Sequence, residues 1–451
     1  MHLPLLEPRL RCCYLNLLRQ LQRGGQSAQS TIRDGRPAAD AATATASFAQ
    51  KLWRFTHNSR VTYPALLDPL LRSAREFTNA RPDRVQLVVH DWCTLAFPNH
   101  TAKLDRKTLS HDRDVGYDLH LALLVDATTG SPVAPLDVTL TTANAALSTR
   151  PQPIPDQPAA HVDQLLSAMK HIDRLELPAK LVHVIDREAD SVGHWRAWDP
   201  DHVVLVRADD RHVRRGGQPT KLSEIHAGFR AEQRFEPVGL VKHHGVEARQ
   251  FVAETRVVLH RPAKRKVRGK SVEMPGRPVE LRFVMTEVRN GDGDVLATWW
   301  LLTNAPAAWG DAAEVARWYY FRWRIESTFK LLKSAGWDVE DWLQRKGEAL
   351  FRKLLLVIAN CVQVWQLELR QDASSEWFKE ILMRLSGRQV KRSVPVTTSG
   401  LLAGLWVWLA VRAVKEDHDE ATIEDLLAKH LPLYAENAVP PPTPRKRKKD
   451  V

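Results

Sequence analysis

The spacing of apolar positions predicts helices in the first eighty residues. Segments 8–24, 48–58 and 63–80 place apolar residues three and four positions apart, with polar residues between them. A stretch rich in serine, alanine and threonine (25–47) separates the first helix from the second, and we expect it to be a loop. In this interpretation residues 1–80 form a helical N-terminal region.

From residue 85 the pattern changes to short apolar runs that are typical of buried strands. Five runs follow one another along the chain: 85–91, 117–127, 135–142, 180–190 and 202–208. Helical spacing over 161–175 and a short helix in "SVGHWRAW" (191–198) separate the last three runs. Three strands followed by alternating helices and strands predict a mixed α/β sheet flanked by helices.

Residues 209–305 interrupt this alternation with further strand-like runs. The runs are "ARQFVAETRVVLHRP", "VELRFVMTEVRNGDG" and "LATWWLLTN", and "RNGDGD" (289–294) is typical of a turn. A basic segment, "RPAKRKVRGKS" (261–271), lies between the first two runs and is predicted to be a loop. We therefore expect an all-β insertion in the sheet domain.

Helices dominate the rest of the chain. They are predicted over 311–335, 346–371, 375–386, 399–415 and 420–430. The final segment, "VPPPTPRKRKKDV", is rich in proline and basic residues, and we expect it to be disordered. The predicted domains are a helical N-terminal region (1–80), a sheet domain (81–208 and 306–371), a β-rich insertion (209–305), C-terminal helices (372–435) and a basic tail (436–451).

One predicted helix places charged and aromatic side chains on a common face. In "WYYFRWRIESTFKLLKSAG" (318–336), about 100° per residue along a continuous helix brings Tyr319, Arg322, Glu326 and Lys333 within an arc of about 60°. An apolar stripe lies beside this row and comprises Phe321, Ile325, Phe329 and Leu332. The row is typical of a functional site. The alternative is surface ion pairing, since Arg322–Glu326 and Glu326–Lys330 have i,i+4 spacing.

Charge and cysteine content narrow the classes of protein. The formal net charge of +12 favours a polyanionic partner, with nucleic acid first and an anionic membrane surface second. The four cysteines form no CxxC pair, which argues against a disulfide framework and a structural zinc site and fits a reducing cytoplasm. The longest apolar run (401–411) is too short to span a bilayer. We expect a cytoplasmic protein with no membrane partner.

Two aspartates follow predicted buried strands. Asp91 ends "VQLVVHD" and Asp186 follows "HVI" in "KLVHVIDREAD". Residues at such strand ends point into the crevice where α/β sheets bind ligands, although a single one is more often a solvated turn residue. With Glu326 they would offer three carboxylates, and oxygen-only ligation suits Mg²⁺. Two such ions stabilise the attacking and leaving oxygens of an in-line phosphoryl displacement.

The spacing Tyr319-x2-Arg322-x3-Glu326-x6-Lys333 resembles the Y-R-E-K signature of insertion-sequence DDE transposases of the insertion-sequence-four type. The segment "VIDREAD" (184–190) is similar to the second-aspartate motif of that family, and we place the first aspartate at Asp91. The family often has small hydroxyl residues after this aspartate, whereas Trp92-Cys93-Thr94 follow here. The resemblance extends from about residue 48 to 365.

The resemblance implies a ribonuclease-H-like fold with a β insertion between the second aspartate and the glutamate. It implies that Asp91, Asp186 and Glu326 are catalytic and bind Mg²⁺, for which Mn²⁺ can substitute. The implied activity is cleavage of transposon ends through a DNA hairpin, followed by strand transfer into target DNA. The partners would be double-stranded DNA (terminal inverted repeats and target) and a second copy of the chain, which helix 399–415 is expected to contact.

Several residues are expected to bind DNA near the cleaved bond. Tyr319, Arg322 and Lys333 would hold phosphates there, since arginine offers a planar fork and lysine a point charge. Trp299 takes the place of the family's base-stacking tryptophan, with Trp300 as its alternate; the alternative is a core residue of a strand. Arg207 resembles a family arginine that contacts DNA, and its alternative is a strand-end charge.

Basic clusters elsewhere are candidates for phosphate contacts or, equally, solvated surface charge. They are Lys264, Arg265 and Lys266 in segment 261–271, the arginines within 211–215, and the tail residues 445–449. The arginines of the N-terminal region (1–80) are expected to face DNA, and we expect the end sequence to be recognised by its helices. Two other functions stay open at this point. One is a related nuclease that cuts without joining, and the other is a catalytically silent, domesticated DNA-binding protein.

Overall fold

The computed structural model of the chain describes residues 6–23, 41–152, 154, 161–198, 200–243, 246–267, 270–333, 337–387, 396–417 and 419–430. The chain divides into two compact units, one of residues 1–18 and 37–371 and the other of residues 19–36 and 372–451. Residue 372, where the C-terminal part of the second unit begins, is also where the C-terminal helices were predicted to begin. The other predicted boundaries lie within the first unit, except the one at 435/436, which lies outside the described residues; all of them stay predictions.

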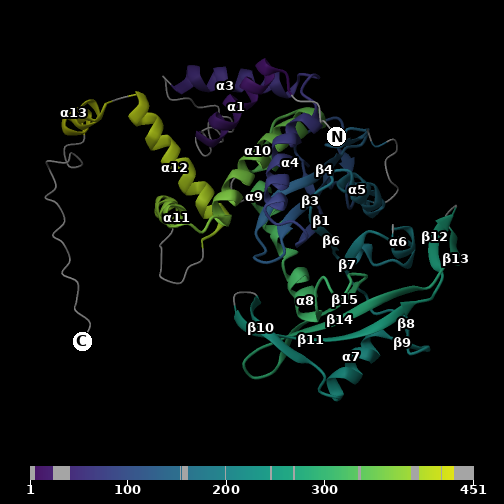
Figure 1. The fold of residues 1–451 in the computed structure, drawn as a ribbon. Helices are drawn as coiled ribbons and strands as arrows, with labels where there is room; N and C mark the ends of the chain where they lie inside the picture. Colours follow the sequence, from purple (N-terminus) through teal and green to yellow (C-terminus); the bar gives the residue numbers. More distant parts are fainter. Residues whose placement is uncertain are drawn as a thin grey trace, which may run out of the picture. The chain divides into compact units, whose positions relative to one another are not determined.

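A thirteen-stranded mixed sheet organises the first unit (Figure 1). Its strands follow the order β5-β4-β3-β1-β6-β7-β15-β14-β11-β8-β9, with β2 beside β3 and β10 beside β11. The bounds are β1 Val85–Ala96, β2 Lys107–Thr108, β3 Val115–Asp126, β4 Pro132–Thr141, β5 Ala146–Ser148, β6 Lys180–Ile185, β7 Val203–Arg207, β8 His212–Arg215, β9 Gln218–Lys221, β10 Glu236–His243, β11 Val246–Leu259, β14 Val279–Arg289 and β15 Val295–Thr303. The expected mixed α/β class is confirmed.

Helices of the first unit flank this sheet, and the three described helices after residue 371 belong to the second unit. Their bounds in the described part of the chain are α1 Pro8–Arg23, α3 Ala41–Thr56, α4 Tyr63–Asn79, α5 Gln164–Asp173, α6 Val192–Ala197, α7 Leu222–Ala231, α8 Ala312–Tyr320, α9 Trp323–Lys333, α10 Gly347–Leu369, α11 Ala373–Leu385, α12 Thr398–Asp417 and α13 Glu420–His430, with 3-10 turns η1 His161–Asp163, η2 Arg187–Ala189 and η3 Val339–Asp341. One hydrophobic cluster joins Leu165 of α5, Trp195 of α6 and Phe229 of α7 to Ile185 and Val206 of the sheet. These three helices therefore cover one face.

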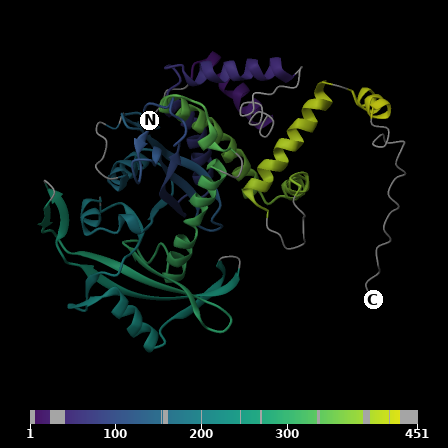
Figure 2. The same cartoon turned by 180° about the vertical axis from the view of Figure 1, so that it is seen from behind.

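The prediction of an all-β insertion was wrong, because the segment 209–305 contains helix α7. Its long strands join the central sheet: β15 pairs with β7, and β14 and β11 follow β15 in the strand order. The apolar face of α7 is short and was missed among the surrounding strand-like runs. The basic segment 261–271 is also no simple loop: it forms most of a hairpin of β12 (Ala263–Val267) and β13 (Lys270–Met274), at the far end of the long strands (Figure 2).

The N-terminal helices are anchored on the rest of the first unit. Helix α4 packs on β4 and α10. The buried guanidinium of Arg352 in α10 donates hydrogen bonds to the carbonyl oxygens of Val61 (2.8 Å) and Thr56 (3.0 Å), in the connection between α3 and α4. Helix α3 begins at Ala41, inside the stretch that was predicted to be a loop. Its alanines explain the error, because alanine has the highest helix propensity.

In the second unit, α11 and α12 pack closely. A Cβ atom on Gly404 would lie 1.8 Å from the carbonyl oxygen of Leu382, so only glycine permits this approach. Leu401 and Trp406 are buried, whereas Val407, Trp408 and Val411 remain exposed on α12. The dimer contact predicted for this helix stays a prediction, and the basic tail 436–451 lies outside the described residues.

One described helix, α10, is long and apolar enough to cross a membrane by length and composition. Of its apolar window, 83% is buried inside the protein, and the core helix of a protein outside membranes meets the same criteria. Its packing against α4 and β4 accounts for this composition.

Four buried histidines lie next to one another: three in the strands β1, β3 and β6, and His202 directly before β7. His90 forms hydrogen bonds with His120 (3.3 Å) and His183 (2.8 Å), and the ring of His202 lies edge-on to that of His183. His202 in turn lies 2.6 Å from a carboxylate oxygen of Asp173 in α5. Burial lowers the pKa of His90 well below its ordinary value and that of His183 to about 3, with neighbouring histidines adding to both shifts. These two rings are therefore neutral in the folded protein.

We expect the free energy of unfolding to fall as the pH drops from 7 to 5. The folded-state pKa values of His90 and His183 are depressed, so their stabilising effect is present above the unfolded-state pKa and is lost below it. Each contributes about 1.4 kcal/mol per pH unit below about 6.5. Denaturant unfolding at several pH values measures the slope. His183→Asn should reduce it and His111→Asn, at an exposed site, should not; equal slopes in both variants would contradict this account.

Candidate active site

The register of two parallel strands places the two predicted aspartates side by side. β1 and β6 pair from Val85↔Lys180 to Val89↔Val184, and two further steps in this register bring Asp91 beside Asp186. Asp186 follows the last residue of β6, as predicted. Asp91 does not end its strand: β1 continues to Ala96, because it also pairs with β3 as far as Ala96↔Gly116. The crevice at Asp91 therefore arises where β6 stops, not where β1 stops.

The single helix predicted over 311–335 is broken in two. α8 ends at Tyr320 and α9 begins at Trp323, so the continuous arc calculated for the Y-R-E-K residues was wrong. The turn lies against the β3–β4 connection: Gly130 has a positive φ of 71°, and a Cβ atom there would lie 2.3 Å from the ring of Phe321. The backbone change at 321–322 directs Arg322 into the sheet, where its side chain is buried.

Arg322 joins the three predicted carboxylates. Its guanidinium donates to Asp91 Oδ2 at 3.0 Å and to Glu326 Oε1 at 2.6 Å, and lies 3.5 Å from Asp186 Oδ2. The three acids thus converge on one cation from β1, from the end of β6 and from α9. The ion pair Arg322–Glu326, considered above as a surface alternative, is present, but Arg322 is buried and also binds the two aspartates. Simple surface pairing does not describe this cluster.

The environment distinguishes the two aspartates. Burial raises the pKa of Asp91 to about 6 against the opposing effect of Arg322. Burial also acts on Asp186, but Arg322, the backbone N–H of Arg187 and the hydroxyl of Tyr319 outweigh it and hold the pKa of Asp186 below its ordinary value. The Tyr319 hydroxyl donates to Asp186 Oδ1 at 2.9 Å. Asp186 therefore stays ionised under conditions in which Asp91 takes up a proton.

The helix that carries Tyr319 is held by residues of the long strands. An aspartate–glutamate capping box, Asp311 and Glu314, begins α8. Just before it, the buried guanidinium of Arg282 in β14 donates to the carbonyl oxygens of Ala305 (3.1 Å) and Gly310 (2.9 Å) while it pairs with Glu254 of β11. Segment 209–305 therefore supports the position of α8.

The donor chemistry of the cluster suits a hard divalent cation, because its three acids offer carboxylate oxygens only. No group of three or more histidine, cysteine, aspartate or glutamate side chains is arranged as a set of metal ligands within the described residues. The guanidinium of Arg322 lies among the carboxylates and offsets part of their negative charge. Mg²⁺ can share this site only when Arg322 moves away from at least part of it.

Lys333 lies apart from the carboxylate cluster. Its ammonium donates to the carbonyl oxygen of Thr94 (2.8 Å) and pairs with Glu340 at 3.0 Å. Glu340 also accepts a hydrogen bond from the backbone N–H of Ala96 (2.8 Å). Sequence reasoning missed Glu340, since its role depends on the fold of the segment after α9. These contacts hold the ammonium of Lys333 beside the end of β1, the strand that also carries Asp91.

The other residues predicted to contact DNA near the cleaved bond differ in the solvent exposure of their side chains. Trp299 is only 7% exposed and its ring packs against that of Tyr319, which favours its role as a core residue. Arg207 is half-buried at the end of β7, close enough to lower the pKa of Asp186. Trp323, which sequence reasoning did not single out, is 46% exposed and directly follows Arg322. The exposure of its ring, which makes it available for stacking on a base, is visible only in the structure.

The basic hairpin lies at a distance from this cluster along the sheet. Lys264 is exposed on β12; Arg265 and Lys266 belong to the same strand, and their side chains are outside the described part of the structure. The base of the hairpin is held by Arg196 of α6, which donates to the carbonyl oxygens of Arg277 (2.8 Å) and Arg261 (3.0 Å). The hairpin is not part of the carboxylate site.

We expect Arg322→Gln to lower the stability of the DNA-free protein and to strengthen its binding of Mg²⁺. Removing the guanidinium leaves partly buried carboxylates unpaired, a loss of roughly 3–5 kcal/mol, and removes the cation that competes with the metal. Thermal unfolding with and without Mg²⁺, with calorimetric titration, measures both effects.

Arg324→Gln is the matched control for this experiment, because Arg324 lies on the same helix and forms no ion pair with a described residue. Its stability and Mg²⁺ affinity should equal those of the wild type. If Arg322→Gln binds Mg²⁺ no more tightly than Arg324→Gln, the guanidinium does not compete with the metal.

Comparison with known proteins adds one finding to this geometry. The family model described as "Transposase DDE domain" matches residues 86–361, which contain β6, α8, α9 and all of β1 except Val85. A search of curated proteins found no match to the chain.

Proposed function

The chain belongs to the transposase DDE domain family, and on this premise we propose that it cuts transposon ends and joins them to target DNA in a reaction that depends on a divalent metal. One observation supports the proposal most strongly. Asp91, Asp186 and Glu326, which are separated by up to 235 residues, converge on the single guanidinium of Arg322. Carboxylates this close together repel one another, and a fold retains them where a cation is bound.

The residues around the acids suit the handling of a phosphodiester. Mg²⁺ (or Mn²⁺), when bound by the three carboxylates, would supply stabilisation of the charge on the attacking and leaving oxygens. Arg322 would exchange its carboxylate partners for a DNA phosphate, since its planar fork fits either group. Lys333, held by Glu340 at the end of β1, would bind a second phosphate. Tyr319 would keep Asp186 oriented through its hydrogen bond.

Finer features of the proposal rest on the resemblance to the insertion-sequence-four type. The sheet order β4-β3-β1-β6-β7, antiparallel and then parallel, supports a ribonuclease-H-like core. A hairpin intermediate, a homodimer that contacts through α12, and a cytoplasmic location belong to the same proposal. The two other functions are a nuclease that cuts without joining and a silent DNA-binding protein; the intact carboxylate cluster favours an active enzyme over the latter.

A cleavage assay tests the function. With Mg²⁺ and a DNA fragment that carries the inverted repeats flanking the gene, the wild type should yield hairpin and joined products on a denaturing gel. Asp91→Asn, Asp186→Asn and Glu326→Gln should each reduce cleavage to background, as should EDTA. Glu188→Gln, an exposed acid two residues from Asp186, is the control and should cut normally. Nicks alone would indicate a nuclease, and no product from the wild type would leave a silent binding protein.

Two tryptophan variants test which ring stacks on a DNA base. Because Trp323 is exposed and Trp299 is buried, Trp323→Ala should reduce hairpin formation more than nicking, while Trp299→Phe, which keeps an aromatic ring in the core, should preserve both. Single-turnover assays that resolve nicks from hairpins measure the difference. The opposite result would restore the assignment of Trp299 that the family resemblance implies.

A further inference from the structure

Beyond the end of β6, one edge of β1 is left without a partner strand among the described residues. The pairing of β1 with β6 ends at Val89↔Val184, whereas its pairing with β3 continues to Ala96↔Gly116. The backbone N–H and C=O groups of a strand point to its two edges in alternation. Every second residue in the last part of β1 therefore directs its backbone groups into the space that β6 leaves empty.

Hydrogen bonds identify two of these residues as Thr94 and Ala96. The carbonyl oxygen of Thr94 accepts from the ammonium of Lys333 at 2.8 Å, and the N–H of Ala96 donates to Glu340 at 2.8 Å. Both partners are side chains, so neither bond belongs to a strand ladder. Because the N–H and C=O of one strand residue point to the same edge, the N–H of Thr94 also faces this space.

One carboxylate oxygen is bound at this open edge by two donors. Oε1 of Glu340 accepts the hydrogen bond of the Ala96 N–H and lies 3.0 Å from the ammonium of Lys333. Backbone N–H groups and lysine ammoniums are also the donors that proteins offer to phosphate oxygens of DNA. The open edge of β1 is thus an anion site that a side chain of the same protein fills.

This carboxylate is placed so that another anion can replace it. The side chains of Glu340 and Lys333 are 31% and 30% exposed, which gives a ligand access to both. The backbone around Glu340 is anchored, because Val339 and Trp342 on either side of it are buried. Rotation of the Glu340 side chain is therefore enough to free the site, without movement of the turn that carries it.

The site lies beside the carboxylate cluster but does not coincide with it. Thr94 and Ala96 follow Asp91 on β1 by three and five residues, or about 10 and 17 Å at 3.3 Å per residue. Lys333 belongs to α9, the helix that also carries Glu326. An anion at this edge is therefore too far from Asp91 to be the phosphate that reacts there. It corresponds to a phosphate a few nucleotides away.

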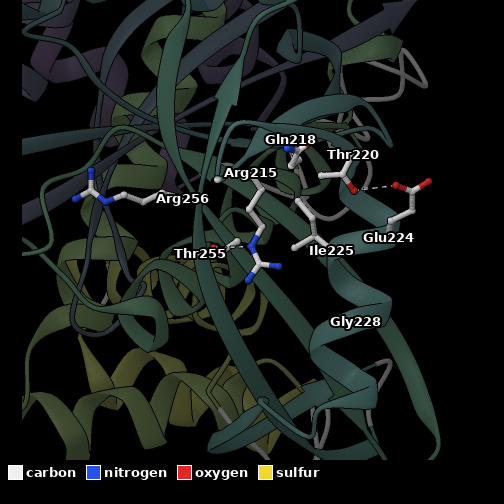
Figure 3. A pocket seen from close by; sticks show the side chains of 9 residues that line it. Arg215, Gln218, Thr220, Glu224, Ile225, Gly228, Thr255 and Arg256 are labelled. Carbon is white, nitrogen blue, oxygen red and sulfur yellow. Dashed lines mark hydrogen bonds between the residues drawn. The ribbon is translucent and has the colours of Figure 1, made fainter.

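A groove between the β8–β9 hairpin and α7 is a separate feature of the surface (Figure 3). The strand register places Thr255, one of its lining residues, on the face of the sheet opposite to Asp186. Its lining also includes the acid Glu224 and Arg256, whose charge is paired with Glu280. This groove therefore has no part in the site at β1.

We propose that the open edge of β1 binds a phosphate of the transposon-end duplex, with the ammonium of Lys333 and the N–H groups of Thr94 and Ala96 as its ligands. This site rests on the proposed function, in which Lys333 binds a second phosphate. Glu340 occupies the site in the DNA-free protein, and DNA replaces its carboxylate by a phosphate. Glu340 therefore lowers the affinity for DNA, although it keeps Lys333 in place before DNA arrives.

Binding of end-bearing duplexes, measured by fluorescence anisotropy at 0.1 M KCl without divalent ions, tests this site. Glu340→Gln should tighten binding roughly two- to fivefold, because it removes the charge that competes with the phosphate and a partly exposed ion pair has about this strength. If Glu340 served only to position Lys333, the same variant would weaken binding. Glutamine keeps an oxygen acceptor for the N–H of Ala96, so the melting temperature should stay close to that of the wild type.

Asp341→Asn is the matched control. Asp341 is exposed in the same turn, so its replacement removes the same charge, but the ion pair of Lys333 is with Glu340. The control should change the affinity much less than Glu340→Gln. Lys333→Gln supplies a second background: it should weaken binding, and Glu340→Gln should have no further effect in it, because the ammonium for which the two anions compete is gone.

Three results would overturn the proposal: unchanged or weaker binding in Glu340→Gln, an equal gain in Asp341→Asn, or a gain from Glu340→Gln that persists in the Lys333→Gln background. Failure of the proposed function is separately visible. If the wild type cuts no DNA but the gain appears and depends on Lys333, the edge of β1 is a DNA site on a protein that is not a nuclease. Normal cleavage with no gain from Glu340→Gln would remove the site and leave the enzyme.

Discussion

The charge balance around Arg322 is the constraint on which this structure depends. The three acids can lie together beside a largely buried sheet because Arg322, at 2.6–3.5 Å from them, offsets part of their negative charge. Three features of the fold are needed at once: the β1–β6 register, the early end of β6, and the break between α8 and α9. The same features would expose the carboxylates to a metal once a DNA phosphate attracts the guanidinium.

The opposite face of the same strands has a different chemistry. His90 precedes Asp91 on β1 and His183 lies three residues before Asp186, so these histidines point away from the acids. They form hydrogen bonds with one another and stay neutral, which spares the sheet a second set of buried charges. One face of β1 and β6 is thus charged and partly open, and the other is polar, neutral and closed. This asymmetry places the carboxylate cluster on the face that α8 and α9 cover.

Segment 209–305 helps to position the residues around the carboxylate cluster. Arg282 holds the chain just before α8, and Trp299 packs against Tyr319, so strands β14 and β15 help to position the hydroxyl that binds Asp186.

The sequence by itself determined the strands β1, β3, β4, β6, β7, β11, β14 and β15, most helices, the acids and the positive charge, because apolar periodicity and residue identity are local properties. Asp91, Asp186, Glu326 and Arg322 were all identified in this way. Only the tertiary structure decided what they contact. Periodicity does not predict that the turn at Phe321 packs against Gly130 or that Glu340 pairs with Lys333. It also does not predict that β1 continues beyond the end of β6. Those arrangements arise from contacts between segments far apart in the chain, and such contacts leave no local pattern.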